Sequence, residues 1–367
     1  MGAGNMITTE AWAIKRQDVE FPSKKITLVE FSFSEITDEE ILVEPLFGCW
    51  EGNMEHAVNR SPIDLCVQRN EDQVVIGNAG VVRILQVGNS IKDVYEGDVG
   101  ILFCNGVPDE YGYPKLIFGY DAPNTIGVLS KKTKLKRNQF IPISSNSQAP
   151  LPQWAAFSLR YITAWANWRV AFNSWRLQNQ DVDPGSAYAV AWGGGVSLAE
   201  LELAKNQGFK TIMITSMPER IALLAKKGIK SIDRSTFSKE NYEQDLISSV
   251  MAHTDGKGAN IFIDNIGSSF QSTLKVLARQ GVITTSGWRS NMIFPLIRSS
   301  ECINRHTHIF THYAHYQEGL NAVEYAIQND WFPVVPEKIY GWEEIPQLLE
   351  DYSKGELKNY FPIFAVN

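Results

Sequence analysis

The segment 187–216 combines apolar runs with a glycine turn in a spacing that suits nucleotide binding. An apolar run over 187–192 leads directly into Gly193-Gly194-Gly195, a helical pattern covers 198–206, and a second apolar run covers 211–215. Glycines let the backbone approach a pyrophosphate, and the N-terminus of the following helix offers N–H groups to it. This order of strand, turn, helix and strand predicts a dinucleotide-binding βαβ unit.

The glycine turn departs from the strict G-x-G-x-x-G pattern, because Trp192 and Ser197 occupy its outer positions. A tight turn in another kind of α/β protein therefore stays open as the alternative interpretation.

The residue that ends the second strand indicates which dinucleotide is bound. An NAD-binding protein usually has an acid there, which bonds the ribose 2′-OH and repels a 2′-phosphate. Here the residue is Ser216, and Arg220 follows four residues later. A charge-assisted pair between Arg220 and a 2′-phosphate predicts a preference for NADPH. The alternative for Arg220 is a solvated position on a helix face.

Composition restricts the kind of protein that carries this turn. The 367 residues have ordinary apolar content, 44%, and a net charge of −7, which argues against a nucleic-acid partner. No apolar run is long enough to span a membrane, and no signal peptide is recognisable, so we expect a cytoplasmic protein that does not contact membranes. The four cysteines form no C-x-x-C pair.

The elements that must position the turn divide into a β-rich first part and an alternating second part. Short apolar stretches with turn residues predict a small barrel within 1–150, followed by a linker at 144–152 and a helix at 152–172. Beyond the glycine turn, an α/β alternation predicts a doubly wound parallel sheet. Its later strands are expected at 212–215, 231–233, 260–264, 282–286 and 307–311, and its helices at 219–227, 240–252 and 270–277. The tail predicts a helix at 320–328, a strand at 338–340 and a helix at 343–353.

Several sequence segments, and the order in which they occur along the chain, resemble those of the medium-chain dehydrogenase/reductase superfamily. VVIGNAGVVRILQVGNSIKDVYEGDVGILF resembles its barrel segment, AFSLRYITAWANW its helix entry, and IFIDNIG and GVITTSG two of its later strands. FGYDAPNTIGVL and IFTHYAHYQEG resemble the crotonyl-CoA reductase and polyketide enoyl reductase branch. The resemblance implies a GroES-like β-barrel catalytic domain at 1–155 and 317–367, around a Rossmann domain at 156–316.

The resemblance also implies that this chain holds no catalytic zinc. The three ligand positions of the zinc enzymes fall on Trp50, Asn78 and Leu159, and none of these side chains suits zinc. Cys49 and His56 are an alternative pair of ligands, but no third ligand accompanies them.

In the crotonyl-CoA reductase branch, the positions near Asn53, Asp121 and His312 line the substrate pocket, and Tyr120 adjoins them. Asp121 and His312 are the candidates for proton transfer because both titrate. Each has a structural alternative: Tyr120 as a packed aromatic residue, Asp121 as a turn cap and His312 as a core histidine. Glu51 is expected to add a negative charge that favours a cationic or amine-bearing substrate; the alternative is that its side chain points to solvent.

The residues expected at the cofactor lie on the helix entry, the glycine turn and the strand ends. They are Thr163, Gly193, Gly194, Gly195, Val196, Ser216, Arg220, Asn265, Gly267, Ser286, Gly287 and Trp288.

The glycine turn and the resemblance together predict a zinc-independent, NADPH-dependent reductase of an activated alkene or carbonyl. A thioester intermediate of secondary metabolism is one candidate substrate. The alternative is a catalytically inactive member of the fold that binds nucleotide or a partner. In the family that this chain resembles, the edge strand of the sheet pairs with its two-fold mate. The resemblance therefore implies a homodimer through the strand expected at 307–311, and such pairing would cover an otherwise exposed edge.

Overall fold

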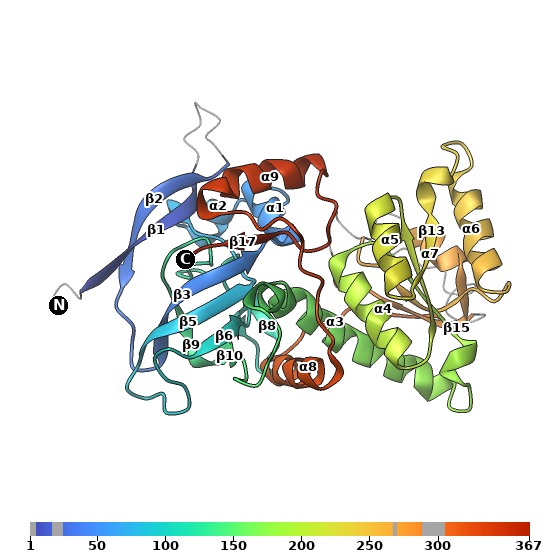
Figure 1. Cartoon of the computed structure of the whole chain (residues 1–367), viewed down its shortest axis with the longest axis horizontal. Coiled ribbons are helices and arrows are strands. Elements are labelled where there is room, and N and C mark those ends of the chain that lie inside the picture. Colours follow the sequence, from blue (N-terminus) through green and yellow to red (C-terminus); the bar gives the residue numbers. More distant parts are fainter. Residues whose placement is uncertain (1–4, 17–24, 267–269, 288–304) are drawn as a thin grey trace. The chain divides into compact units, whose positions relative to one another are not determined.

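The computed structural model describes residues 5–16, 25–266, 270–287 and 305–367, and its chain divides into two compact units (Figure 1). Met1–Ile162 together with His315–Asn367 form the first, which we call the β-rich unit. Thr163–Ala314 form the second, which we call the parallel-sheet unit.

The β-rich unit is built on a curled antiparallel half-barrel of six strands. Its main path is β10 (Phe140–Pro142), β6 (Val99–Leu102), β5 (Gly80–Val87), β3 (Glu40–Cys49) and β17 (Ile363–Ala365), and β9 (Thr133–Lys136) also pairs with β3. The predicted barrel is therefore present as a half-barrel. Because β17 comes from the tail, the end of the chain returns to the same sheet as the first part.

Smaller elements complete the β-rich unit. A second sheet has the order β2 (Thr27–Ser34), β1 (Met6–Lys15), β4 (Gln73–Val74), and β7 (Asn105–Pro108) pairs with β8 (Pro114–Ile117). The helices are α1 (Gly52–Val58), α2 (Leu65–Arg69), α8 (Tyr316–Asn329) and α9 (Ile345–Lys354). The strand expected at 338–340 is only a bridge between Tyr340 and Phe364.

The parallel-sheet unit contains the predicted doubly wound sheet. Its order is β13 (Lys230–Asp233), β12 (Lys210–Thr215), β11 (Tyr188–Trp192), β14 (Ala259–Ile263), β15 (Leu277–Thr284), β16 (His308–Phe310), and all neighbours are parallel. Every residue of β11 is buried, which explains its continuous apolar run. Strand order reverses between β11 and β14, the position at which open α/β sheets bind ligands.

Helices cover both faces of this sheet (Figure 1). α4 (Gly195–Asn206) and α5 (Pro218–Lys226) follow β11 and β12, and α6 (Tyr242–His253) and α7 (Phe270–Lys275) follow β13 and β14. The first pair and the second pair lie on opposite faces, as right-handed crossovers require when the strand order reverses.

One element boundary in this unit differs from the sequence prediction. The helix expected to reach Leu277 ends at Lys275, and the strand expected to begin at Val282 begins at Leu277. The pairing of β14 with β15 shifts register between Ala259 and Ile261, and Gln280 has a φ of 58°. This irregularity breaks the alternation that marks a strand in sequence.

The helix α3 (Leu151–Gln178) is longer than the predicted 152–172. Three of its tryptophans belong to the core, because Trp154, Trp168 and Trp175 are at most 1% exposed. Trp154 packs edge-on against Phe332, with ring centroids 4.9 Å apart, and Trp175 packs against Phe209 at 4.9 Å. Among the described residues, no helix has both the length and the apolar character needed to cross a bilayer.

Candidate functional site

The glycine turn joins β11 to α4 at the carboxyl edge of the parallel sheet. The Gly193 N–H donates to the Ile214 carbonyl at 3.0 Å, and Gly194 is the N-cap of α4 with no side-chain cap. The first N–H groups of a helix lack partners within that helix. The N-terminus of α4, including Gly195 and the half-buried Val196, is therefore suited to bind an anion.

Gly194 is not required by the local backbone. Its φ of 162° is extended backbone that any residue adopts, and a Cβ added there would meet nothing closer than Ser197 Oγ at 3.9 Å. The glycine therefore leaves room beside the helix N-terminus, as a phosphate-binding turn needs.

Asn265 ties the ends of two strands to α4. Its Oδ1 accepts hydrogen bonds from the Ser286 N–H at 2.7 Å and the Ser286 hydroxyl at 3.0 Å. Its Nδ2 donates to Ser197 Oγ at 3.1 Å and to Glu200 Oε1 at 3.4 Å. These bonds fix the Asn265 side chain and connect the segments that follow β14 and β15 to the first turns of α4.

Glu200 belongs to this network and was not singled out by the sequence analysis. It is fully buried on α4, and burial raises the pKa of its carboxyl well above the usual range. Ala199 and Leu201, which flank Glu200, are also fully buried. Glu200 could have been identified from the sequence, because an acidic residue between two apolar residues is unusual in a buried helix.

The remaining residues expected at the cofactor lie in the same unit. Ser216 is half-buried directly after β12, and Arg220 is half-buried in the first turn of α5. Thr163 lies on α3 and is half-buried. Gly287 follows β15, whereas Gly267 and Trp288 lie outside the described residues.

In the β-rich unit, two backbone hydrogen bonds hold three segments side by side. The Cys49 N–H donates to the Ala79 carbonyl at 3.1 Å, and the Gly77 N–H donates to the Gly119 carbonyl at 2.9 Å. Four buried atoms on these segments have no hydrogen-bond partner within the described ranges: Glu51 Oε1, Asn53 Oδ1, Asn78 Oδ1 and the Tyr120 hydroxyl. Because buried polar atoms are normally paired, such atoms are the expected lining of a polar binding site.

The structure places Asn53 at the start of α1 and Tyr120 in the turn that follows β8. Tyr120 is 4% exposed; burial and, secondarily, the charge of Asp121 raise the pKa of its hydroxyl to about 12. Asp121 Oδ1 accepts from the Ile117 N–H at 2.6 Å, so this carboxylate closes the turn.

His312 lies in the parallel-sheet unit, two residues after β16. Its ring is half-buried, and its backbone N–H donates to Asn167 Oδ1 at 3.1 Å. The position of this histidine is thus fixed through its backbone, and its imidazole can be changed without removing that bond.

Glu51 does not add the net negative charge expected from the sequence. Arg160 Nε donates to Glu51 Oε2 at 2.7 Å, and the two side chains form a buried ion pair. Burial raises the pKa of the Glu51 carboxyl, and the adjacent guanidinium opposes that effect. Because the pair is neutral as a whole, the argument for a cationic substrate was wrong.

The donor chemistry at the expected zinc positions does not fit a zinc ion. Trp50 is fully buried and Asn78 is 1% exposed, and neither an indole nor an amide is a usual zinc ligand. In the part of the chain that the structure describes, no three His, Cys, Asp or Glu side chains are grouped to hold a metal.

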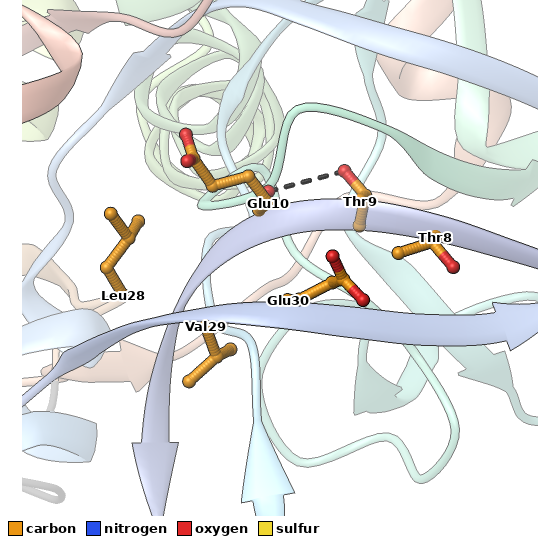
Figure 2. Close-up of a pocket in the computed structure, with 6 residues that line it drawn as sticks. All are labelled: Thr8, Thr9, Glu10, Leu28, Val29 and Glu30. Carbon is orange, nitrogen blue, oxygen red and sulfur yellow. Dashed lines mark hydrogen bonds between the residues drawn. The ribbon is translucent and has the colours of Figure 1, made fainter.

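Two surface hollows lie away from all these residues. One, of about 460 Å³, lies on the ribbon of β1 and β2, where the Thr9 hydroxyl donates to the Glu10 carbonyl at 3.3 Å (Figure 2). The other, of about 330 Å³, lies at the start of α3 beside Phe332. Neither is lined by a residue singled out in the sequence.

The fold is similar to that of known dehydrogenases and reductases. Residues 195–326 match the family model described as zinc-binding dehydrogenase. A crotonyl-CoA carboxylase/reductase is 18% identical with a TM-score of 0.77, over 98% of this chain and 88% of that one. A 2-octenoyl-CoA carboxylase/reductase from a Streptomyces species, solved with NADP and 2-octenoyl-CoA, is 16% identical with a TM-score of 0.80. The match covers 98% of this chain and 87% of that one. An alcohol dehydrogenase from Thermotoga maritima is 18% identical with a TM-score of 0.74, and the match covers 98% of this chain and 99% of that one.

The chain therefore has the fold of the medium-chain dehydrogenases and reductases. Its residues 195–326 match the family model of the zinc-binding dehydrogenases. The matched range begins at Gly195, the last residue of the glycine turn, and contains the Asn265 network but none of the three expected zinc positions.

Proposed function

We propose that the chain is a zinc-independent, NADPH-dependent reductase of an activated alkene or carbonyl. The observation that carries this proposal is the glycine turn at the N-terminus of α4. Gly194 leaves space there that the backbone does not need, at the point where strand order reverses. Gly193, Gly194, Gly195 and Val196 would bind the pyrophosphate, and bound NADPH would supply hydride.

The preference for NADPH is supported by the residues that follow β12. The strand ends at Ser216 rather than at an acid, and Arg220 lies in the first turn of the next helix. A solved neighbour with the same fold holds NADP. At the other strand ends, Asn265, Ser286 and Gly287 would hold the nicotinamide end, and Thr163 would contribute from α3.

The proton is proposed to come from Asp121 or His312, with Tyr120 and Asn53 binding the substrate by hydrogen bonds. Asn53 Oδ1 and the Tyr120 hydroxyl, which have no hydrogen-bond partner in the described part of the chain, support this division of roles. Because the charge of Glu51 is balanced by Arg160, the substrate is expected to be neutral at its reacting end, as an enone or acyl thioester is.

We further propose that the chain forms a homodimer through β16. This strand lies at one edge of the parallel sheet and pairs only with β15 in the described residues. Light scattering at micromolar concentration should give twice the mass of one chain. A monomeric mass would contradict the proposal.

Calorimetric titration with NADPH and NADH tests cofactor binding directly. We expect NADPH to bind at least tenfold more tightly than NADH. NADPH binding without reduction of any enone, aldehyde or acyl thioester would instead support an inactive nucleotide-binding protein.

A further inference from the structure

An ion pair adjoins two of the three positions at which the resemblance expects zinc ligands. Glu51 directly follows Trp50, and Arg160 directly follows Leu159. Glu51 is 4% exposed and Arg160 is 8% exposed, so both charges are removed from water. A buried pair of this kind needs further hydrogen bonds to offset its desolvation.

The Arg160 guanidinium makes those further bonds with two other parts of the chain. Its Nη2 donates to the Trp50 carbonyl at 2.8 Å, and its Nη1 donates to the Tyr360 carbonyl. Its guanidinium carbon lies 5.6 Å from the centroid of the Phe361 ring. One side chain on α3 thus connects the end of β3 with the segment that precedes β17.

A backbone bond connects the same two segments, because the Trp50 N–H donates to the Pro362 carbonyl at 2.8 Å. The guanidinium and this bond together hold the entry to α1, where Asn53 lies. A structural metal holds several chain segments together by binding a ligand from each of them. Arg160 holds segments together by donating hydrogen bonds instead, because its planar guanidinium offers five N–H groups in a fixed geometry.

We infer that the Arg160–Glu51 pair cross-links this site in place of a metal ion, and that Arg160 is the positioning residue for segment 49–53. Through that segment it positions Asn53 toward the substrate. The part of this inference that concerns turnover rests on the proposed reductase activity. The cross-link itself does not.

The test uses the double variant Arg160→Met/Glu51→Leu, because replacing a buried ion pair with apolar residues of similar size commonly preserves folding. We expect the double variant to bind NADPH as the unmodified protein does, while kcat falls at least tenfold. Amide hydrogen exchange in segment 50–56 should accelerate at least tenfold. Wild-type turnover together with wild-type exchange would overturn the inference.

Arg160→Lys provides a second measurement that does not depend on the double variant folding. Lysine keeps the positive charge but lacks the planar fork, so exchange in segment 50–56 should again accelerate. Unchanged exchange would show that charge alone is sufficient and would overturn the cross-link. Arg279→Ala, an exposed arginine of β15, is the control and should change neither exchange nor kcat.

The two proposals fail separately. If the unmodified protein reduces nothing, the proposed function fails, but the exchange measurements still decide the cross-link. If the unmodified protein is active and the double variant is equally active with unchanged exchange, only the cross-link fails.

Discussion

Gly287 lies so close to Asn265 that a Cβ atom added to it would be 1.9 Å from the Asn265 carbonyl oxygen. No side chain can occupy that space without moving the backbone. Gly194, at the other side of the proposed cofactor site, has no such neighbour, since the nearest atom is Ser197 Oγ at 3.9 Å. The two glycines are therefore present for different reasons.

This contrast predicts opposite results for two alanine variants. Gly194→Ala should change the free energy of unfolding by less than about 1 kcal/mol, because its backbone accepts any residue. The same variant should weaken NADPH binding about tenfold, because the new methyl group occupies the space left for phosphate.

Gly287→Ala should instead destabilise the fold by about 1–3 kcal/mol. Denaturant unfolding and calorimetry measure both; Gly194→Ala with unchanged NADPH affinity would refute the assigned role of the turn.

Arg220→Ala tests the source of the proposed cofactor preference. Loss of a desolvated pair with the 2′-phosphate should weaken NADPH binding by about 1–3 kcal/mol and leave NADH binding unchanged. Arg279→Ala, at the opposite end of the parallel strands, is the matched control and should change neither affinity. Equal loss of NADPH and NADH affinity in Arg220→Ala would indicate that the arginine supports only the fold.

Asp121→Asn and His312→Ala test the proposed proton donors. Asparagine retains an oxygen that can accept from the Ile117 N–H, and the His312 backbone bond to Asn167 does not involve the imidazole. Both variants should therefore fold. For the residue that donates the proton, kcat should fall about 100-fold or more with little change in NADPH affinity. Full turnover in both variants would exclude both residues.

Tyr120→Phe tests the buried hydroxyl through the pH dependence of stability. The pKa of Tyr120 is raised from 10.0 to about 12 in the folded protein. Between these values the unfolded chain loses the proton first and binds fewer protons than the folded chain, so stability falls as pH rises, by about 1 kcal/mol per pH unit. Removing the hydroxyl should reduce this alkaline loss and leave stability at pH 7 unchanged or higher, since the hydroxyl has no partner among the described residues. An identical alkaline loss in both proteins would contradict the assignment.

The central strand of the parallel sheet could be predicted from the sequence because it is buried on both faces. β11, with every residue buried, appears as an apolar run, and the glycine turn marks its end. The boundary between α7 and β15 could not be predicted in the same way. There the register shift and the positive φ of Gln280 remove the periodic pattern that separates a helix from a strand.

The candidate site was only partly predictable for a related reason. Glycines and strand ends are local features, whereas Glu51 and Arg160 are separated by 109 residues along the chain. No spacing rule connects them, so Glu51 alone indicated a negative charge that its distant partner in fact balances. The Glu200 contact with Asn265, across 65 residues, was missed because it too depends on the tertiary fold.

Consumption of NADPH tests most directly the proposed reaction, in which the chain transfers hydride from NADPH to an activated double bond. Purified protein, treated with a chelator, should oxidise NADPH in the presence of at least one enone, aldehyde or α,β-unsaturated acyl thioester. Added zinc should not increase the rate, and NADH should be at least tenfold less effective at equal concentration. No oxidation with any of these substrates, or activity that requires zinc, would contradict the account.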